Sequence, residues 1–211
     1  ADDWPISYDD LSSHYDLNDH MMSVSGLAGD PAYPPINGLL PPVPAGDLGR
    51  ILGPALNRLN WHWWPSYSAI ATRAVRGRSP CINLGPCNTG CPQGAKSSVD
   101  VTYWPLALQN GVKLLTNTVC QKVLVEHGRV CGVQVRRQDG STDILAARIV
   151  VLAANAIGTA RLLLNSACAG HENGLANSSG LVGKNLMLHP LGYVEASFEE
   201  QFDTDKGPQG C

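Results

Sequence analysis

The segment KLLTNTVCQKVLVEHGRVCGVQVRRQDGSTDILAARIVVLAANAIGTARLLLNSA, residues 113–167, decides the expected fold. Its first part holds three apolar-rich runs separated by the hairpin signals His-Gly-Arg and Gln-Asp-Gly-Ser: residues 113–126, 130–137 and 143–154. In the second run Val133 and Val135 alternate with polar residues, which is typical of a sheet with one solvent-facing side. The segment therefore predicts an antiparallel β-meander.

The end of this segment has a different pattern. Residues 149–154 are apolar without alternation, as expected of a strand covered on both faces. A turn of small residues at 155–159 and a helix within ARLLLNSA follow. Backbone N–H groups at such a helix start can face a phosphate, although any α/β protein contains strand–turn–helix units. A meander that returns into a buried strand is more informative, because it is typical of flavoproteins, and it favours a flavin-binding domain.

The composition limits the function classes. The chain has 211 residues, 44% hydrophobic and 16% charged, with a net charge of −3. This balance argues against nucleic acid or an anionic membrane surface as the main partner. No apolar run reaches the roughly 20 residues that span a bilayer. Because the sequence begins at Ala1 and ends at Cys211 in a loop-like stretch, we expect a piece of a longer protein and leave its compartment open.

Helices are predicted before the meander. Residues 5–22 begin with a possible capping box between Ser7 and Asp10, and Asp47 can cap a second helix. In that second helix Gly53-Pro54 predicts a kink. A short third helix in TYWPLALQNG is expected to end at Gly111.

The stretch WHWWP, residues 61–65, places three tryptophans close together. Such residues either cover a domain edge or form a wall beside a ring-shaped ligand, and we favour the first interpretation.

The stretch CINLGPCNTGCPQGAK, residues 81–96, gathers three cysteines in a loop rich in glycine and proline. Cys81, Cys87 and Cys91 could hold a metal, form a disulfide or simply pack the loop. A structural zinc site needs four protein ligands, and a disulfide would leave one thiol over. The remaining cysteines, Cys120, Cys131, Cys168 and Cys211, are single, which is unlike a secreted disulfide scaffold.

Four stretches together resemble the glucose–methanol–choline (GMC) oxidoreductases, flavoenzymes that oxidise alcohols and sugars. They are WPISYDDL, CNTGCPQGAKSSVDVTYWPLAL, VVLAANAIGTARLLLNSA and LVGKNLMLHP. The nearest branch is that of bacterial sugar, gluconate and long-chain alcohol dehydrogenases. The resemblance implies an α/β fold with three parts: a helical and Pro/Gly-rich flank at 1–65, part of an FAD-binding Rossmann-like domain with an inserted meander at 66–168, and the start of an α+β substrate domain at 169–211.

The resemblance also implies site residues. The backbone of Cys120 corresponds to the position that meets the adenine edge, and Ser98 lies in the loop that leads into the short helix. The positions near the cofactor are Ala153, Asn155, Thr159, Asn185 and His189. The Gly-x-Gly-x-x-Gly fingerprint is absent, and the family's catalytic His pair is expected beyond the end of this chain. Catalytic residues therefore stay unassigned, and His189 is not taken as the base.

The implied function is an FAD-dependent dehydrogenase or oxidase in which a base takes the hydroxyl proton and hydride passes to the flavin. In the glucose and fructose dehydrogenase branch, similarly spaced cysteines carry a 3Fe–4S cluster that relays electrons to a cytochrome. The fatty-alcohol branch has a comparable loop without an established cluster, so both interpretations of Cys81, Cys87 and Cys91 stay open. The alternative from another class is an iron–sulfur or structural metal-binding module without flavin.

Overall fold

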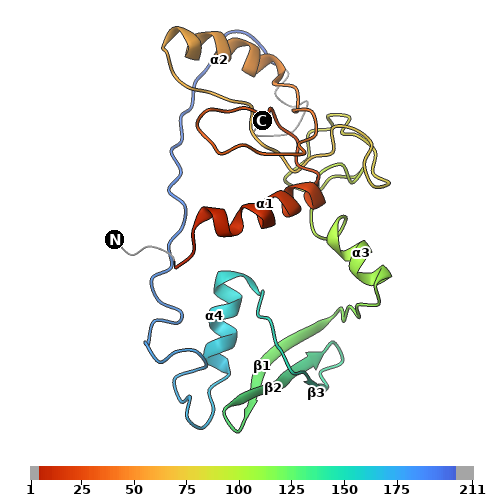
Figure 1. The fold of residues 1–211 in the computed structure, drawn as a ribbon, viewed down its shortest axis with the longest axis vertical. Helices are drawn as coiled ribbons and strands as arrows, with labels where there is room; N and C mark the ends of the chain where they lie inside the picture. The colour runs from red at the N-terminus through yellow and green to blue at the C-terminus, as the bar shows by residue number, and fades with distance from the viewer. Residues whose placement is uncertain (1–4, 203–211) are drawn as a thin grey trace. The chain divides into compact units, whose positions relative to one another are not determined.

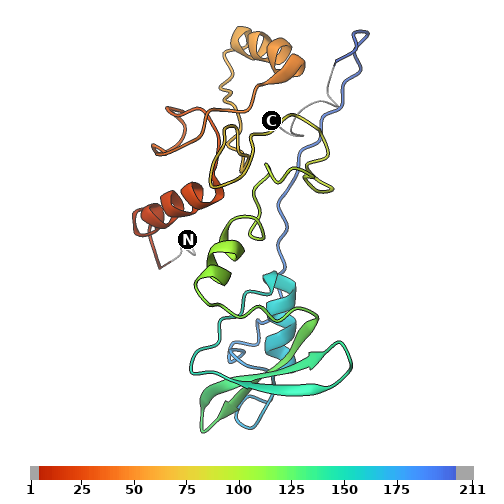
Figure 2. The same cartoon turned by 90° about the vertical axis from the view of Figure 1, so that its right-hand side faces the viewer.

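The computed structural model describes residues 5–202, which form two compact units (Figures 1 and 2). Of the described residues, the first unit contains 5–112 with 196–202, and the second contains 113–195. The first contains α1 (Tyr8–Met22), α2 (Gly46–Arg58) and α3 (Tyr103–Gln109). The second contains β1 (Thr118–Glu126), β2 (Arg129–Arg137), β3 (Thr142–Ala146) and α4 (Asn155–Asn165). Within the described part of the chain, no helix combines the length and apolarity that a membrane span requires.

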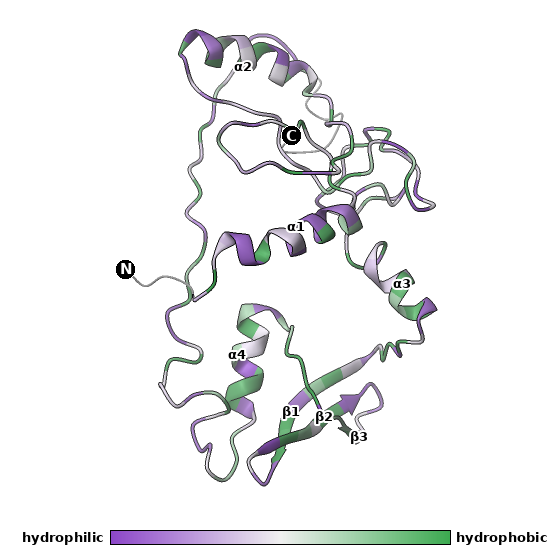
Figure 3. Ribbon diagram, in the orientation of Figure 1, coloured by the Kyte–Doolittle hydropathy of each residue, from purple (hydrophilic) through white to green (hydrophobic). Residues whose placement is uncertain are grey.

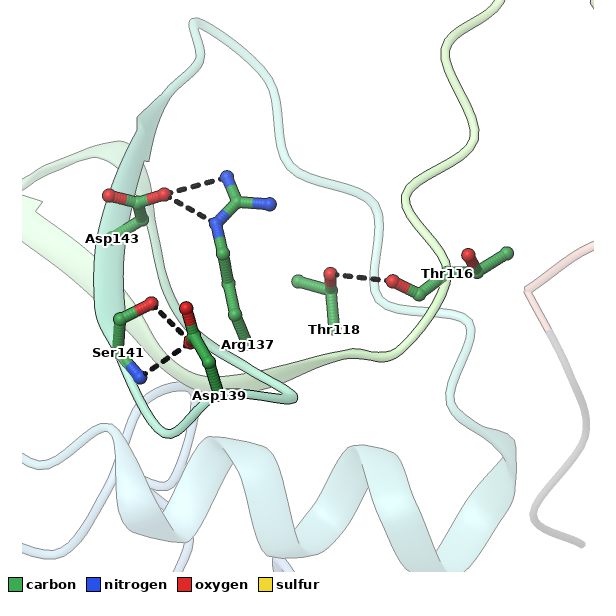
Figure 4. Close-up of polar contacts among 6 residues, drawn as sticks. All are labelled: Thr116, Thr118, Arg137, Asp139, Ser141 and Asp143. Carbon is green, nitrogen blue, oxygen red and sulfur yellow. Dashed lines mark hydrogen bonds and ion pairs between the residues drawn. The ribbon is translucent and has the colours of Figure 1, made fainter.

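The three strands form the predicted antiparallel meander, in the order β1-β2-β3. His127 and Gly128 connect β1 to β2 with φ values of 49° and 74°, as a two-residue hairpin turn requires. In the second turn Asp139 accepts hydrogen bonds from the N–H and the hydroxyl of Ser141, at 2.9 and 2.6 Å (Figure 4). Next to this turn Arg137 and Asp143 form an ion pair at 2.6 Å. Both predicted hairpins are confirmed.

The core of the second unit lies where α4 packs against β1. Val123, Leu162 and Leu175 are its buried residues, and the apolar positions of α4 and the strands are visible in Figure 3. Ser166, which is fully buried, joins the two elements. Its Oγ accepts the Val123 N–H at 2.8 Å and donates to the Leu162 carbonyl at 2.6 Å. One hydroxyl thus fixes the end of α4 to the sheet.

The strand predicted at 149–154 does not form within residues 5–202, and there the segment is not buried on both faces. Ile149 and Val151 are 81% and 82% exposed. Leu152 packs against the core on the other side. A strand needs a neighbour for its backbone hydrogen bonds, and no segment of residues 5–202 pairs with 149–154. The segment is therefore extended but unpaired.

The boundaries of two helices also differ from the predictions. α4 begins at Asn155, so the residues predicted as a turn form its first turn. The Asn155 Oδ1 accepts the Gly158 N–H at 2.9 Å, which satisfies one of the N–H groups that the first turn leaves free. Asp47 lies in the first turn of α2 rather than at its N-cap, which is Ala45. α2 continues through Pro54 without a break.

The tryptophans of 61–65 hold parts of the first unit together. The indole N–H of Trp63 donates to Asn57 at 2.8 Å, and that of Trp64 donates to the Leu27 carbonyl at 2.8 Å. A β-carbon on Gly53 would lie 2.8 Å from the Trp63 ring, so α2 needs a glycine there. Trp61 is 64% exposed.

The predicted capping box of α1 is confirmed. The Asp10 carboxylate accepts hydrogen bonds from the Ser7 N–H and hydroxyl, at 2.8 and 2.7 Å. The Ser7 Oγ in turn accepts the Asp10 N–H at 3.3 Å. The backbone bond first, and the hydroxyl bond next, lower the pKa of Asp10. Because the folded pKa lies below the unfolded one, this contribution to stability is present above about pH 4 and is lost as pH falls through the folded pKa.

We expect Ser7→Ala to raise the pKa of Asp10 part of the way back to its ordinary value. The hydroxyl bond is lost while the backbone bond remains. An NMR titration of the Asp10 carboxyl measures this. Ser13→Ala, an exposed change in the same helix, is the control, and an equal pKa in all three proteins would contradict the assignment.

Candidate functional site

A cleft of about 640 Å³ opens in the second unit between β1, β2 and one face of α4. This volume lies within the range of small-molecule sites. The strands contribute Val119–Lys122, Gln134 and Arg136, and α4 with the residue before it contributes small and basic side chains. Cys120 is the predicted site residue that lies in this cleft.

The hydrogen-bond register decides which backbone groups of β1 are free. The Arg137 N–H donates to Ser141 at 2.9 Å, and the Cys131 carbonyl accepts from Ala147 at 2.9 Å. In a strand, the backbone N–H and C=O groups of every second residue point to the same edge. The backbone groups of Val135, which lies between these two residues, therefore also face β3. Val135 is the register partner of Cys120. The N–H and C=O of Cys120 therefore do not pair with β2 and turn toward the open edge of β1.

An independent contact supports this register. A bulge follows Cys120, because Lys122 rather than Gln121 is the next residue in register. The alternation then turns Val123 toward the same open edge. Its N–H indeed donates outside the sheet, to Ser166. Along this edge, the Val123 N–H is bonded to Ser166 within the unit. The backbone N–H and C=O of Cys120 face the cleft as a donor and an acceptor.

The cleft carries positive charge. Lys122, Arg136 and Arg161 line it, and no Asp or Glu does. None of these three cations takes part in an ion pair found among residues 5–202. A ligand with an anionic group is therefore favoured there.

The start of α4 contributes small residues to the cleft, and two backbone N–H groups there are already hydrogen-bonded. Ala154 and Gly158 line the cleft, which lets a ligand come close. The Ala154 N–H donates to the Thr159 hydroxyl at 3.2 Å, and Asn155 accepts the Gly158 N–H. The side-chain oxygens of the predicted residues Asn155 and Thr159 thus accept hydrogen bonds from the backbone at the start of α4. Ala153 is exposed beside them.

The other predicted cofactor residues lie elsewhere. Ser98 belongs to the first unit, where its hydroxyl donates to Asp100. Asn185 lines a separate cavity of about 610 Å³ between α4 and residues 183–187. His189 is exposed in an irregular segment. The structure therefore brings Cys120 together with α4, and it does not place Asn185 or His189 in the same cleft.

The cysteine loop shows no cluster of metal ligands among the described residues. Among residues 5–202, no three His, Cys, Asp or Glu side chains gather closely enough to hold a metal ion. Cys81, Cys87 and Cys91 are half-buried free thiols, whereas Cys211 lies outside the described residues. Burial acts to raise the pKa of Cys91, but the backbone N–H groups of residues 93–96 outweigh it and the pKa is lowered. Nothing in this geometry supports the predicted cluster.

Sequence reasoning missed the basic residues of the cleft. Lys122 and Arg136 interrupt apolar strands, which is a weak signal of a solvated face. Arg161 lines the same cleft from α4. No sequence pattern indicated that α4 and the strands border one cleft.

Comparisons with known proteins agree on one family. The family described as GMC oxidoreductase matches residues 68–191. The chain is 45% identical over 192 residues to 2-methyl-1,2-propanediol dehydrogenase of Mycolicibacterium austroafricanum, covering 90% of this chain and 35% of that protein. It is 30% identical over 194 residues to the fructose dehydrogenase large subunit of Gluconobacter japonicus, covering 89% and 35%. With paromamine 6'-oxidase of Streptomyces fradiae, it shares 31% identity over 196 residues, covering 90% and 35%. The chain thus spans about a third of the length of these relatives.

Proposed function

Because the chain belongs to the GMC oxidoreductase family, we propose that it is part of the FAD-binding domain of an enzyme that oxidises the CH–OH group of an alcohol or sugar. In this proposal the antiparallel meander is an insertion in a Rossmann-like domain, just before the sheet's last strand. Residues 149–154 would be that last strand, paired in the complete enzyme. Their exposed Ile149 and Val151 support this, because apolar side chains of this kind require a cover.

The observation that carries the proposal is the free backbone edge of Cys120 in the basic cleft. An adenine ring offers a donor and an acceptor side by side, which match a neighbouring C=O and N–H. The cationic side chains suit the phosphates that the same cofactor carries. The small residues Ala154 and Gly158 leave room for a ring. FAD, when bound, would accept the hydride, and the described residues would bind and orient it.

A small alcohol or diol is the substrate class that we propose. The support is the 45% identity to a protein named 2-methyl-1,2-propanediol dehydrogenase. We do not extend the proposal to a cluster-mediated cytochrome acceptor, because the cysteine loop gathers no metal ligands among the described residues. The iron–sulfur module without flavin lacks support for the same reason.

The complete enzyme tests the function directly. We expect it to copurify with FAD, and a small vicinal diol added without an electron acceptor should bleach the flavin absorbance. A protein without flavin, or a bound flavin that no alcohol or sugar reduces, would contradict the proposal.

Cys120→Pro tests the adenine contact. Proline removes the N–H that turns to the open edge, and an edge strand tolerates proline where its N–H does not pair. We expect FAD affinity to fall by about tenfold, as the loss of one hydrogen bond to a ligand predicts. Flavin release measured by fluorescence gives the affinity, and thermal unfolding shows whether the variant is folded.

Cys120→Val is the matched control. It keeps a small apolar side chain and the backbone donor, so FAD affinity should stay unchanged. Burial raises the pKa of the Cys120 thiol, which is consistent with a packing role for the sulfur. Loss of flavin in the valine variant would show that the sulfur itself is needed.

A further inference from the structure

Two arginines of the first unit lie in a pocket that no carboxylate enters. The pocket measures about 370 Å³ and is lined by Met21, Arg76, Arg78, residues 101–102 and part of α3. No Asp or Glu belongs to its lining, and none of the ion pairs found within residues 5–202 contains Arg76 or Arg78. Arg78 is half-buried and Arg76 is exposed. A guanidinium that is partly withdrawn from water gains from an anionic partner, and the described residues supply none here.

Arg78 is held rigidly by neutral groups. One guanidinium nitrogen donates to the Ser97 hydroxyl at 2.7 Å and another to the Ser23 hydroxyl at 2.8 Å. Both serines are buried, at 5% and 4% exposure. Burial first, and the charge of Arg76 next, lower the pKa of Arg78. The guanidinium is thus oriented but its charge is not compensated.

Arg76 is placed by a tight turn. Val75 and Arg78 exchange both backbone hydrogen bonds, at 3.1 and 2.9 Å. The two residues between them, Arg76 and Gly77, have φ values of 48° and 77°. Asparagine or glycine is the ordinary choice at such a position, and an arginine with positive φ is unfavourable. Its side chain donates to the Met21 carbonyl at 3.3 Å, so the strained backbone aims a second cation at the pocket.

Asp19, the acid nearest to Met21 in sequence, does not act as the partner. Asp19 lies in the last turn of α1, two residues before Met21. Burial first, and the charge of Asp16 next, raise the pKa of Asp19. A guanidinium beside the Asp19 carboxylate would lower its pKa. Asp19 therefore does not neutralise the positive charge of the pocket.

We propose that this pocket binds an oxyanion, a phosphate or a carboxylate, carried on a small molecule. Two guanidinium groups that converge from one turn can each donate to the oxygens of such a group. Val101, Pro105 and Leu106 give the lining an apolar part, which suits a short hydrocarbon body. Gln109 adds an amide to the lining. The site is independent of the flavin proposal, since all of its residues belong to the first unit.

The test compares inorganic phosphate and succinate with sodium chloride at equal ionic strength. We expect phosphate, succinate or both to raise the Tm saturably, by roughly 3 °C at ten times the Kd. A rise with phosphate alone assigns a phosphorylated ligand, and a rise with succinate alone assigns a carboxylate. No saturable rise with either anion would overturn the proposal.

Arg76→Asn removes one cation while giving the turn a residue that favours its φ, so the variant is expected to fold at least as well as the parent. We expect its anion affinity to drop at least tenfold. Arg73→Asn is the matched control, because Arg73 is exposed and lies three residues away outside the pocket. An equal loss of affinity in both variants would reduce the effect to general surface charge and would overturn the site.

Discussion

Replacing Leu162 with alanine is expected to lower the free energy of unfolding of the second unit by about 2–5 kcal/mol. Leu162 is 8% exposed and forms the core together with Val123 and Leu175. Removing its side chain loses apolar burial and leaves a cavity that the sheet on one side and the helix on the other cannot fill. Urea unfolding followed by circular dichroism measures the change.

Leu164→Ala is the control for this variant. Leu164 lies on the same helix but is 40% exposed, so the same chemical change should cost about 1 kcal/mol or less. Equal losses in the two variants would show that the core does not lie where α4 meets β1. Leu162→Ala should also release flavin from the complete enzyme, because the cleft is lined from the same side of α4.

The second large effect is expected at Gly132, in the centre of the sheet. Gly132 is buried in β2 and is in register with Leu124 of β1 and Ala146 of β3. A β-carbon there would lie 2.3 Å from the Leu145 carbonyl oxygen. Since that oxygen belongs to the backbone, the strands themselves must move apart. We expect Gly132→Ala to destabilise the unit by about 3 kcal/mol.

Gly192→Ala is the matched control for Gly132→Ala. Gly192 belongs to the same unit, and no atom would lie within 4 Å of an added β-carbon. Its free energy of unfolding should therefore stay nearly unchanged. Amide hydrogen exchange can locate the damage, because the Gly132 variant should lose protection in β2 and β3 first. If both variants unfolded at the same urea concentration, the close approach of β3 to Gly132 would be disproved.

Several elements could be predicted from local sequence because local chemistry determines them. The capping box of Ser7 and Asp10 acts over three residues, and His127-Gly128 forms a hairpin turn through its own φ values. The alternation of Val133 and Val135 with polar residues indicates which face of β2 is covered. These features need no knowledge of distant residues.

Residues 149–154 show the limit of that reasoning. Their composition is that of a strand covered on both faces, yet a strand exists only when another strand accepts its hydrogen bonds. No such neighbour lies within residues 5–202, and the chain spans about a third of its relatives' length. Composition could therefore identify the segment but not its pairing.

The sequence by itself determined the family and the meander, because the motifs, turns and alternation that define them are local. Only the tertiary structure decided the chemistry of the cleft. The direction of the Cys120 N–H depends on the register with Val135, and the direction of the Val123 N–H depends on the bulge at Gln121. Arg161 and Lys122 line the same cleft because of how α4 packs against β1. Register and packing are sums of many weak contacts between distant residues, and no short stretch of sequence contains them.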